Sequence, residues 1–389
     1  MEPTTNETIR QMEDQYTSGV YTKRPVAIVR GLEAHLWDAD GREYIDCVGG
    51  QGAANLGHAN PVVAKAIADQ AMRLISCPEM FYNDKRAALE EKLVGMTGMG
   101  RVFLSNSGTE AVEAAIKFAR LLTGRSEVVA AMRGFHGRTM GALSATWEKK
   151  YREPFEPLVP GFSHIPYNDP AALEAAVTDK TAAVMLEVVQ GEGGVRPGDP
   201  AFLKLAQDLC RQRGALLILD EIQTGWGRTG KMFAHQHYAL EPDLLVVAKS
   251  MAGGLPMGAT LIATRLGALP GQVHGSTFGG NPLACAASLA AIGYLEDNHL
   301  PERAAELGAW FLGMLSRIES PLIREVRGLG LMAGIELKQK VTPYLQDLMG
   351  KGVMALPAGL TVMRFLPPLV ISKSDLQIVV EKISEVLQG

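Results

Sequence analysis

The sequence lacks three features that mark special classes of protein. It has no Lys- or Arg-rich run, and its 38 basic and 42 acidic residues give a formal net charge of −4. Nucleic acid and anionic membranes bind basic patches, so neither is an expected partner. No apolar run approaches the roughly 20 residues that span a bilayer. The first residues, MEPTTNETIRQMEDQ, contain no apolar signal region. We therefore expect a cytoplasmic protein.

Cysteine is scarce as well. The four cysteines, at positions 47, 77, 210 and 285, show no C-x-x-C spacing. This pattern indicates neither a zinc site nor a disulfide framework, and we expect no metal. Most of these cysteines should be small buried apolar residues.

Glycine, in contrast, is abundant, with 42 residues in a chain of 389. The glycines cluster in GGQGAANLGH, MRGFHGRTMG, QGEGGVRPG, GWGRTG, MAGGLPMG and STFGGNP. One such cluster is typical of a tight turn. Six of them at the ends of expected helices and strands indicate that several backbone segments approach one ligand closely.

The order of elements predicts an α/β fold with a large, mostly parallel sheet. Helical patterns at 61–74, 84–95, 109–122, 200–213 and 281–296 alternate with the apolar runs RVFLS, EVVAAM, TAAVMLEVV, ALLILDE and DLLVVAK. Continuous apolar strands are typical of a sheet that helices cover on both faces.

Both ends of the chain have a different pattern, which predicts a small α+β domain. Residues 26–48 alternate around a D-A-D-G turn and predict an antiparallel hairpin. We expect residues 1–60 to form an N-terminal arm and part of the small domain. Residues 61–295 should form the large, cofactor-binding domain, and residues 296–389 the C-terminal small domain.

The stretch GWGRTGK resembles a phosphate-binding P-loop, but Met232 occupies the position of the final hydroxyl. A P-loop also leads directly from a strand into a helix, whereas IQTG intervenes here. A nucleotide hydrolase is therefore disfavoured. The strand LLILDE before this stretch ends in the acidic residues Asp220 and Glu221. This end of a strand is where open α/β sheets bind ligands.

The next strand, DLLVVAK, ends in Lys249. Burial beside apolar residues lowers the pKa of an amine and makes it nucleophilic. A lysine that forms a Schiff base with pyridoxal 5'-phosphate (PLP) needs this property, together with an Asp at the pyridine nitrogen. Lys249 and Asp220 therefore predict a PLP site and are our catalytic candidates.

The phosphate of PLP favours a helix N-terminus. Ser107, Gly108 and Thr109 begin such a helix, although capping alone would explain the two hydroxyls. Phe135 and His136 could stack on a flat ring, although a single aromatic residue more often belongs to a core.

Several motifs in this order resemble the class III, fold-type I PLP aminotransferases, which include ornithine, acetylornithine and 4-aminobutyrate aminotransferases. The resemblance covers residues from about 20 to 385. The motifs are SNSGTEA, FHGRT, LILDEIQTGWGRTGK, AKSMAGGLPMGA and STFGGNPLA. The resemblance implies fold type I, PLP as cofactor and an aminotransferase activity, and it makes the P-loop likeness coincidental.

The resemblance also implies roles for individual residues. Lys249 binds PLP covalently and moves the substrate proton, and Asp220 pairs with the pyridine nitrogen. Thr277 reaches the phosphate of a neighbouring subunit, which implies a homodimer with shared active sites. The remaining expected contacts with PLP are those of Gln223 with the ring hydroxyl, Phe135 and His136 with the ring, and Ser107, Gly108 and Thr109 with the phosphate.

For the substrates, Arg138 and Arg364 match carboxylate-binding positions, where forked donors suit a carboxylate. Glu187 matches a residue that pairs with Arg364 while an ω-amine is bound and releases it for 2-oxoglutarate or glutamate. Tyr21 and Gln51 match substrate-pocket positions. Gln51 replaces the tyrosine of ornithine aminotransferases, which argues against free ornithine.

Within the family, segments such as TWEKKYREPF and RFLPPLVI most resemble aminotransferases of carrier-protein pathways for lysine and arginine. Their donor is a lysine or ornithine whose α-amine is capped by the C-terminal glutamate of a small acidic carrier, LysW. Acetylornithine aminotransferase is the close alternative, and an aminomutase or a non-catalytic protein is less favoured. A docking rim for the carrier is predicted from basic residues, namely Lys23, Arg24, Lys149, Lys150 and Arg152.

Overall fold

The computed structural model describes residues 5–388 and confirms the predicted α/β class. Its largest sheet has seven strands. Strand β12 is antiparallel to both of its neighbours, and the other pairs are parallel. In order across the sheet, the strands are β4 (Arg101–Ser105), β12 (Gly258–Ile262), β11 (Leu244–Val247), β10 (Leu216–Asp220), β7 (Thr181–Glu187), β5 (Glu127–Ala131) and β6 (Phe162–Ile165).

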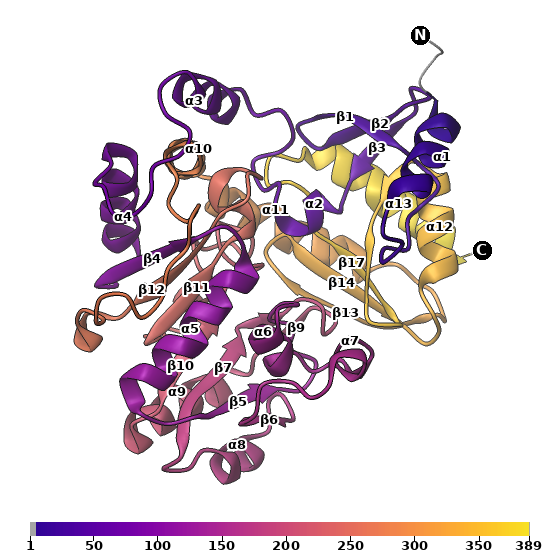
Figure 1. Ribbon diagram of the computed structural model, residues 1–389. Helices are drawn as coiled ribbons and strands as arrows, with labels where there is room; N and C mark the ends of the chain where they lie inside the picture. The colour runs from indigo at the N-terminus through magenta and orange to yellow at the C-terminus, as the bar shows by residue number, and fades with distance from the viewer. Residues whose placement is uncertain (1–4, 389) are drawn as a thin grey trace.

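Helices cover both faces of this sheet. Figure 1 shows α5 (Gly108–Thr123) lying across one face, where it packs with Met185 and Ile218. Helix α9 (Pro200–Arg213) packs with Leu186 and Leu219, the next residues along the same strands. Successive side chains of a strand point to opposite faces. The continuous apolar runs are therefore what a sheet covered on both faces needs.

The two ends of the chain form a second region with two four-stranded sheets. Figure 1 shows the indigo N-terminal and yellow C-terminal segments side by side, joined by parallel pairing of β3 with β15. One sheet contains β1 (Ile28–Leu32), β2 (His35–Asp38), β3 (Glu43–Asp46) and β15 (Val353–Met354). The other contains β13 (Ile323–Leu329), β14 (Met332–Leu337), β17 (Val362–Phe365) and β16 (Leu356–Ala358).

Several helices complete both regions. The predicted helices are present as α3 (Pro61–Ala71), α4 (Asp84–Thr97), α5, α9 and α10 (Pro282–Asp297). The second region has α1 (Asn6–Tyr16), α11 (Leu300–Leu315), α12 (Thr342–Gly350) and α13 (Lys373–Gln388). None of the helices within residues 5–388 has the length and apolarity needed to cross a membrane. Domain boundaries after residues 60 and 295 stay a proposal, and α10 runs through the second.

The predicted hairpin over residues 26–48 is a three-stranded antiparallel unit. Strands β2 and β3 pair around the predicted turn, and β1 pairs with β2 through a second turn. At that turn Glu33 has a φ of 50° and pairs with His58. The alternating pattern predicted the strands correctly. The turn at Glu33 contains no glycine, so there was little indication in the sequence that a second turn divides this segment.

The loop that resembles a P-loop joins the two regions. Arg228, at its centre, is fully buried, and burial lowers its pKa to about 9. Its guanidinium donates to the carbonyl oxygens of Leu331 at 2.9 Å and Pro367 at 2.5 Å. It also donates to Oδ1 of Asn55 at 2.6 Å. These three contacts connect the loop after β10 to segments of the second region.

We expect Arg228→Leu to lower the melting temperature by roughly 5 °C, because three buried acceptors lose their donor at a cost of about 1–3 kcal/mol each. Calorimetry of the purified variant measures this shift. The matched control is Arg317→Leu, since Arg317 is exposed. A variant that melts within a degree of the native protein would show that this arginine does not hold the two regions together.

Candidate active site

A cavity of about 410 Å³ lies at the carboxyl ends of the central strands. The structure brings most of the predicted site residues to this one place. The predicted residues that line it are Gln51, Ser107, Gly108, Thr109, Phe135, His136, Arg138, Glu187, Asp220, Gln223 and Lys249. Of the others, Arg364 contacts two lining residues, Gln223 and Glu192, whereas Tyr21 and Thr277 do not line the cavity.

Asp220 ends β10 and is fixed by two hydrogen bonds. Its Oδ2 is 2.7 Å from Nδ1 of His136, and its Oδ1 accepts the Ile222 N–H at 3.0 Å. Burial lowers the pKa of His136, but the hydrogen bond and charge of Asp220 outweigh this and raise it above its ordinary value. His136 was predicted as a ring-stacking residue. Its Nδ1 contacts Asp220 and orients that carboxylate, and the predicted stacking of its ring stays a prediction.

A second carboxylate, that of Glu187, lies beside Asp220 because the two residues are partners in the pairing of β7 with β10. Its oxygens accept the N–H groups of Phe135 and Gly191, both at 3.0 Å. Burial raises the pKa of Glu187 to about 7, with the charge of His136 acting against this rise and that of Asp220 adding to it. Glu187 is therefore a buried group anchored to the backbone.

The predicted pairing of Glu187 with Arg364 is wrong. Arg364, on β17, is buried, and its Nη1 lies 2.6 Å from Oε1 of Glu192. The same nitrogen donates to Oε1 of Gln223 at 3.2 Å. Both oxygens of Glu187 are occupied by backbone donors, so Arg364 pairs with the other glutamate of QGEGG. A lone charge between glycines was the sequence signal that the prediction overlooked.

Lys249 follows β11 and lines the cavity. Its backbone φ is 45°, a left-handed conformation that costs a residue other than glycine about 1 kcal/mol or more. Burial lowers the pKa of its amine, and the charge of Glu192 acts in the opposite direction. The amine makes none of the hydrogen bonds or ion pairs found within residues 5–388. A strained lysine with an unoccupied amine is typical of a functional site.

The N-terminus of α5 forms another wall of the cavity. Ser107 caps the helix, and its Oγ accepts the Glu110 N–H at 3.3 Å. The first N–H groups of a helix lack acceptors within the helix and attract anions. A Cβ at Gly108 would lie 2.8 Å from Cδ1 of Ile222, so only glycine fits there without a shift. This end of α5 is suited to hold a phosphate.

Aromatic residues form the side of the cavity near Arg138. The rings of Phe135 and Tyr151 meet edge to face, with centroids 6.1 Å apart. The exposed guanidinium of Arg138 lies 3.7 Å above the Tyr151 ring. On the other side, Gln51 is exposed and has a φ of 59°. Cation–π contact holds Arg138 at the wall with its donors accessible to a carboxylate.

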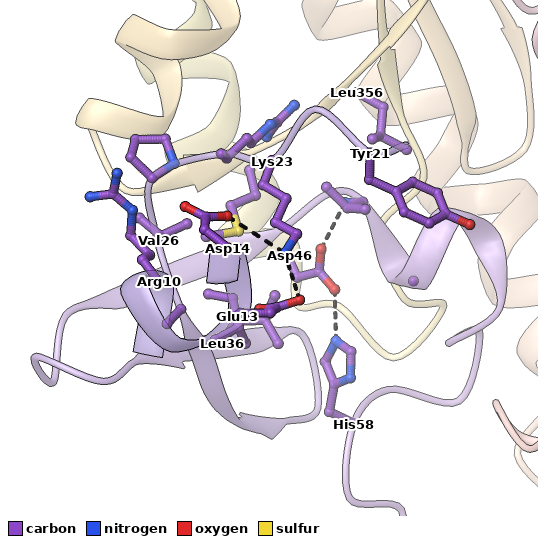
Figure 2. A pocket seen from close by; sticks show the side chains of 17 residues that line it. Arg10, Glu13, Asp14, Tyr21, Lys23, Val26, Leu36, Asp46, His58 and Leu356 are labelled. Atoms are coloured by element: carbon purple, nitrogen blue, oxygen red, sulfur yellow. Dashed lines mark hydrogen bonds and ion pairs between the residues drawn. The ribbon is translucent and has the colours of Figure 1, made fainter. Parts of the chain in front are cut away.

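Tyr21 and Thr277 lie outside this cavity. Tyr21 is 76% exposed and lines a separate cavity of about 670 Å³ (Figure 2). Lys23 in that cavity is paired with Glu13 at 2.9 Å. The predicted contact of Tyr21 with the substrate stays a prediction. Thr277 is exposed, and its expected reach to a neighbouring subunit stays a prediction.

Comparisons with known proteins identify the same architecture and chemistry. The family model described as Aminotransferase class-III matches residues 16–387. A [LysW]-aminoadipate semialdehyde transaminase of Deinococcus radiodurans is 51% identical over 97% of this chain and 89% of its own length. An acetylornithine aminotransferase of Methanothermobacter thermautotrophicus is 46% identical over 98% of this chain and 99% of its own. Among solved structures, the ornithine aminotransferase of Toxoplasma gondii superposes with a TM-score of 0.96 at 36% identity, covering 99% and 95% of the two chains.

Proposed function

The chain belongs to the class III aminotransferase family, and within it we propose a donor that is a lysine or ornithine with a capped α-amine. The enzyme is a PLP-dependent transaminase of fold type I. In the proposed reaction it moves the terminal amine of this donor to 2-oxoglutarate, or runs in reverse from glutamate. This choice of donor is supported by the 51% identity, over 97% of the chain, to a [LysW]-aminoadipate semialdehyde transaminase. Acetylornithine aminotransferase is the alternative, supported by relatives at 46% and 45%.

The residues of the cavity fit PLP. A free lysine amine, a buried carboxylate and a helix N-terminus line one space of about 410 Å³. Lys249 would bind the aldehyde, Asp220 the pyridine nitrogen, and Ser107, Gly108 and Thr109 the phosphate. Phe135 would lie on the ring and Gln223 at its hydroxyl. PLP, when bound, supplies an electron-withdrawing ring that stabilises negative charge on the substrate carbon.

Two groups of this chain then handle protons. Because burial lowers the pKa of the Lys249 amine, a larger fraction of it is neutral and able to accept the proton of the substrate carbon. Asp220, held by His136, would favour a protonated pyridine nitrogen, because a nearby negative charge stabilises the protonated form of a base. Arg138 orients the substrate through its carboxylate.

Glu192 takes the switching role predicted for Glu187. Glu192 lies 2.6 Å from Arg364 in the free protein, and in this proposal the pair persists while the amine donor is bound. When 2-oxoglutarate enters, its carboxylate replaces that of Glu192 at the guanidinium. A buried arginine without either partner would be costly, which is why a single site needs a movable carboxylate for two substrates.

We expect Glu192→Ala to shift preference toward glutamate, because Arg364 is then free to bind a carboxylate at all times. The half-reaction rate with the capped ω-amine should fall about tenfold or more relative to that with glutamate. Stopped-flow measurement of both half-reactions gives this ratio. Glu187→Ala is the matched variant and should change both rates alike. A shift in preference with Glu187→Ala and none with Glu192→Ala would reverse the assignment.

A homodimer is part of the proposal. The loop that carries Thr277 also carries Phe278, which is 60% exposed. Arg86 holds this loop near another exposed apolar segment by donating to the carbonyl oxygens of Gly280 and Phe81. If a partner subunit covered these apolar residues, Thr277 would lie next to the PLP cavity of that partner.

The donor is tested by a panel of carrier-linked lysine, Nα-acetyl-lysine and Nα-acetylornithine, each with 2-oxoglutarate. The proposal expects the highest kcat/KM with carrier-linked lysine. A higher kcat/KM with Nα-acetylornithine would identify the enzyme as an acetylornithine aminotransferase.

The predicted docking rim for the carrier is only partly beside the active site. Lys150 lines a cavity next to the PLP cavity, whereas Lys23 is paired with Glu13 and lines the cavity of Figure 2. Arg24 lines the same cavity as Lys23. We therefore restrict the proposed docking rim to Lys149, Lys150 and Arg152, in α7 (Lys149–Arg152).

A further inference from the structure

A second cavity, of about 370 Å³, adjoins the first and shares Phe135 and Glu192 with it. We call it the arginine cavity. Its ionisable lining residues are Arg133, Glu148, Lys150, Tyr151, Glu192, Arg196, Arg324 and Glu336.

Positive charge is in excess at the arginine cavity. Glu336 is bound by three guanidinium groups, from Arg196 at 2.9 Å, Arg324 at 3.1 Å and Arg327 at 2.6 Å. Glu192 is occupied by Arg364. No ion pair within residues 5–388 involves Arg133 or Lys150, although both line the cavity. Glu148, the third carboxylate of the lining, has no ion pair within residues 5–388 either. Four cations of the lining thus face three carboxylates, two of which are already paired.

This arrangement is costly in the free protein. Burial lowers the pKa of Arg196, and the charges of Arg327 and Arg133 lower it further. The Nε of Arg196 is buried without a hydrogen-bond partner. Arg133 has a φ of 66°, a strained conformation for a residue other than glycine. Unpaired donors, crowded cations and backbone strain around one cavity are expected where a ligand supplies the missing negative charge.

The position of the cavity indicates which part of a ligand it takes. Arg138, on the side of the PLP cavity, lies over the ring of Tyr151. Lys150, on the side of the arginine cavity, has its Nζ 4.8 Å from the same ring. A ligand with two carboxylates could place one at Arg138 and the other at Lys150 and Arg133, across the wall formed by Phe135 and Tyr151.

We infer that the arginine cavity binds a carboxylate on the acyl cap of the amino donor, and so selects an anionic, glutamyl-type cap over an acetyl cap. This inference rests on the proposed function, because it assumes a donor with a capped α-amine. Arg138 takes the carboxylate of the amino acid itself. Arg133 and Lys150, the cations without an ion pair, take the carboxylate of the cap.

The test uses two ligands that lack the reacting amine, Nα-(N-acetyl-γ-glutamyl)-norleucine and Nα-acetyl-norleucine. The N-acetyl group on the glutamyl cap replaces the peptide bond to the carrier, so that this cap carries only the charge of its carboxylate. Calorimetry with the PLP-loaded enzyme should give a dissociation constant at least tenfold lower for the glutamyl ligand. Arg133→Gln and Lys150→Gln together should remove most of this difference and leave binding of the acetyl ligand unchanged. Arg317→Gln, at an exposed position outside the cavity, is the matched control and should change neither.

Two outcomes overturn the inference. One is equal binding of both ligands by the native enzyme, and the other is equal weakening of both by the double variant. Arg133 and Lys150 are exposed enough that loss of fold should not follow, and thermal melting of the double variant checks this. Failure of the proposed function is seen separately, as absence of turnover with every capped lysine and ornithine. The binding measurements test the arginine cavity whether or not the enzyme turns over these donors.

Discussion

Lys249→Ala is expected to reduce transamination on the order of 10⁴-fold or more while the fold stays intact. Two contributions are lost together, since the same amine binds the cofactor covalently and moves the substrate proton. The fold should not suffer, because the native amine has no hydrogen bond or ion pair within the described residues and its burial is unfavourable. Alanine keeps the left-handed φ of 45° at the same cost as lysine, so the substitution adds no backbone strain.

Three measurements on the PLP-loaded protein check this expectation. Glutamate formed from 2-oxoglutarate gives the turnover, and thermal melting gives the stability. Borohydride reduction followed by mass spectrometry should find the cofactor attached in the native protein and not in the variant. Lys204→Ala, on the solvent side of α9, is the control for all three measurements. Turnover above a small fraction of native, or cofactor still attached after reduction, would mean that another amine carries the reaction.

Much of this site could be predicted because strand order fixes where strand ends meet. Asp220 and Lys249 each follow a buried apolar strand, and β10 and β11 are parallel neighbours. Parallel neighbours present their carboxyl ends at one edge, so two polar residues distant in sequence had to come together. The helix that begins at Gly108 was predictable for a similar reason, since its cap and its apolar spacing are local signals.

What could not be predicted depends on contacts between distant segments. Glu187 and Glu192 are five positions apart in one motif, and spacing alone does not tell which of them faces Arg364, on β17. That choice follows from the backbone donors that occupy Glu187. Strand β12 was overlooked because its segment follows a glycine-rich stretch. It becomes a strand by antiparallel pairing with β4 and β11 on either side.

His136 illustrates the same limit at the scale of one side chain. An aromatic residue next to Phe135 in a glycine-rich loop suggested stacking on a ring. The loop also directs Nδ1 to Asp220 at 2.7 Å, and the backbone N–H of His136 donates to Oγ1 of Thr146 at 2.9 Å. The sequence identified a residue of the site but could not distinguish contact with the cofactor from support of a carboxylate.

Asp220→Asn is expected to lower turnover about 10³-fold with the cofactor still bound. The amide has the shape of the carboxylate. Its oxygen can accept the Ile222 N–H, and its NH2 can donate to Nδ1 of His136 in the tautomer protonated at Nε2, so the local geometry should persist. Only the negative charge is lost, and with it the proton that Asp220 holds on the pyridine nitrogen. Such charge matters most as negative charge develops on the substrate carbon, so the loss should appear in kcat more than in substrate binding.

Single-turnover rates with a donor deuterated at the reacting carbon locate the loss, because slower proton removal should strengthen the isotope effect. Asp199→Asn is the matched control. Asp199 caps α9 through its side chain, a role that asparagine fills equally well. Turnover within tenfold of native would show that the charge of Asp220 is dispensable. An equal loss in Asp220→Asn and His136→Phe, with the cofactor retained in both, would instead show that the orientation of this carboxylate matters as much as its charge.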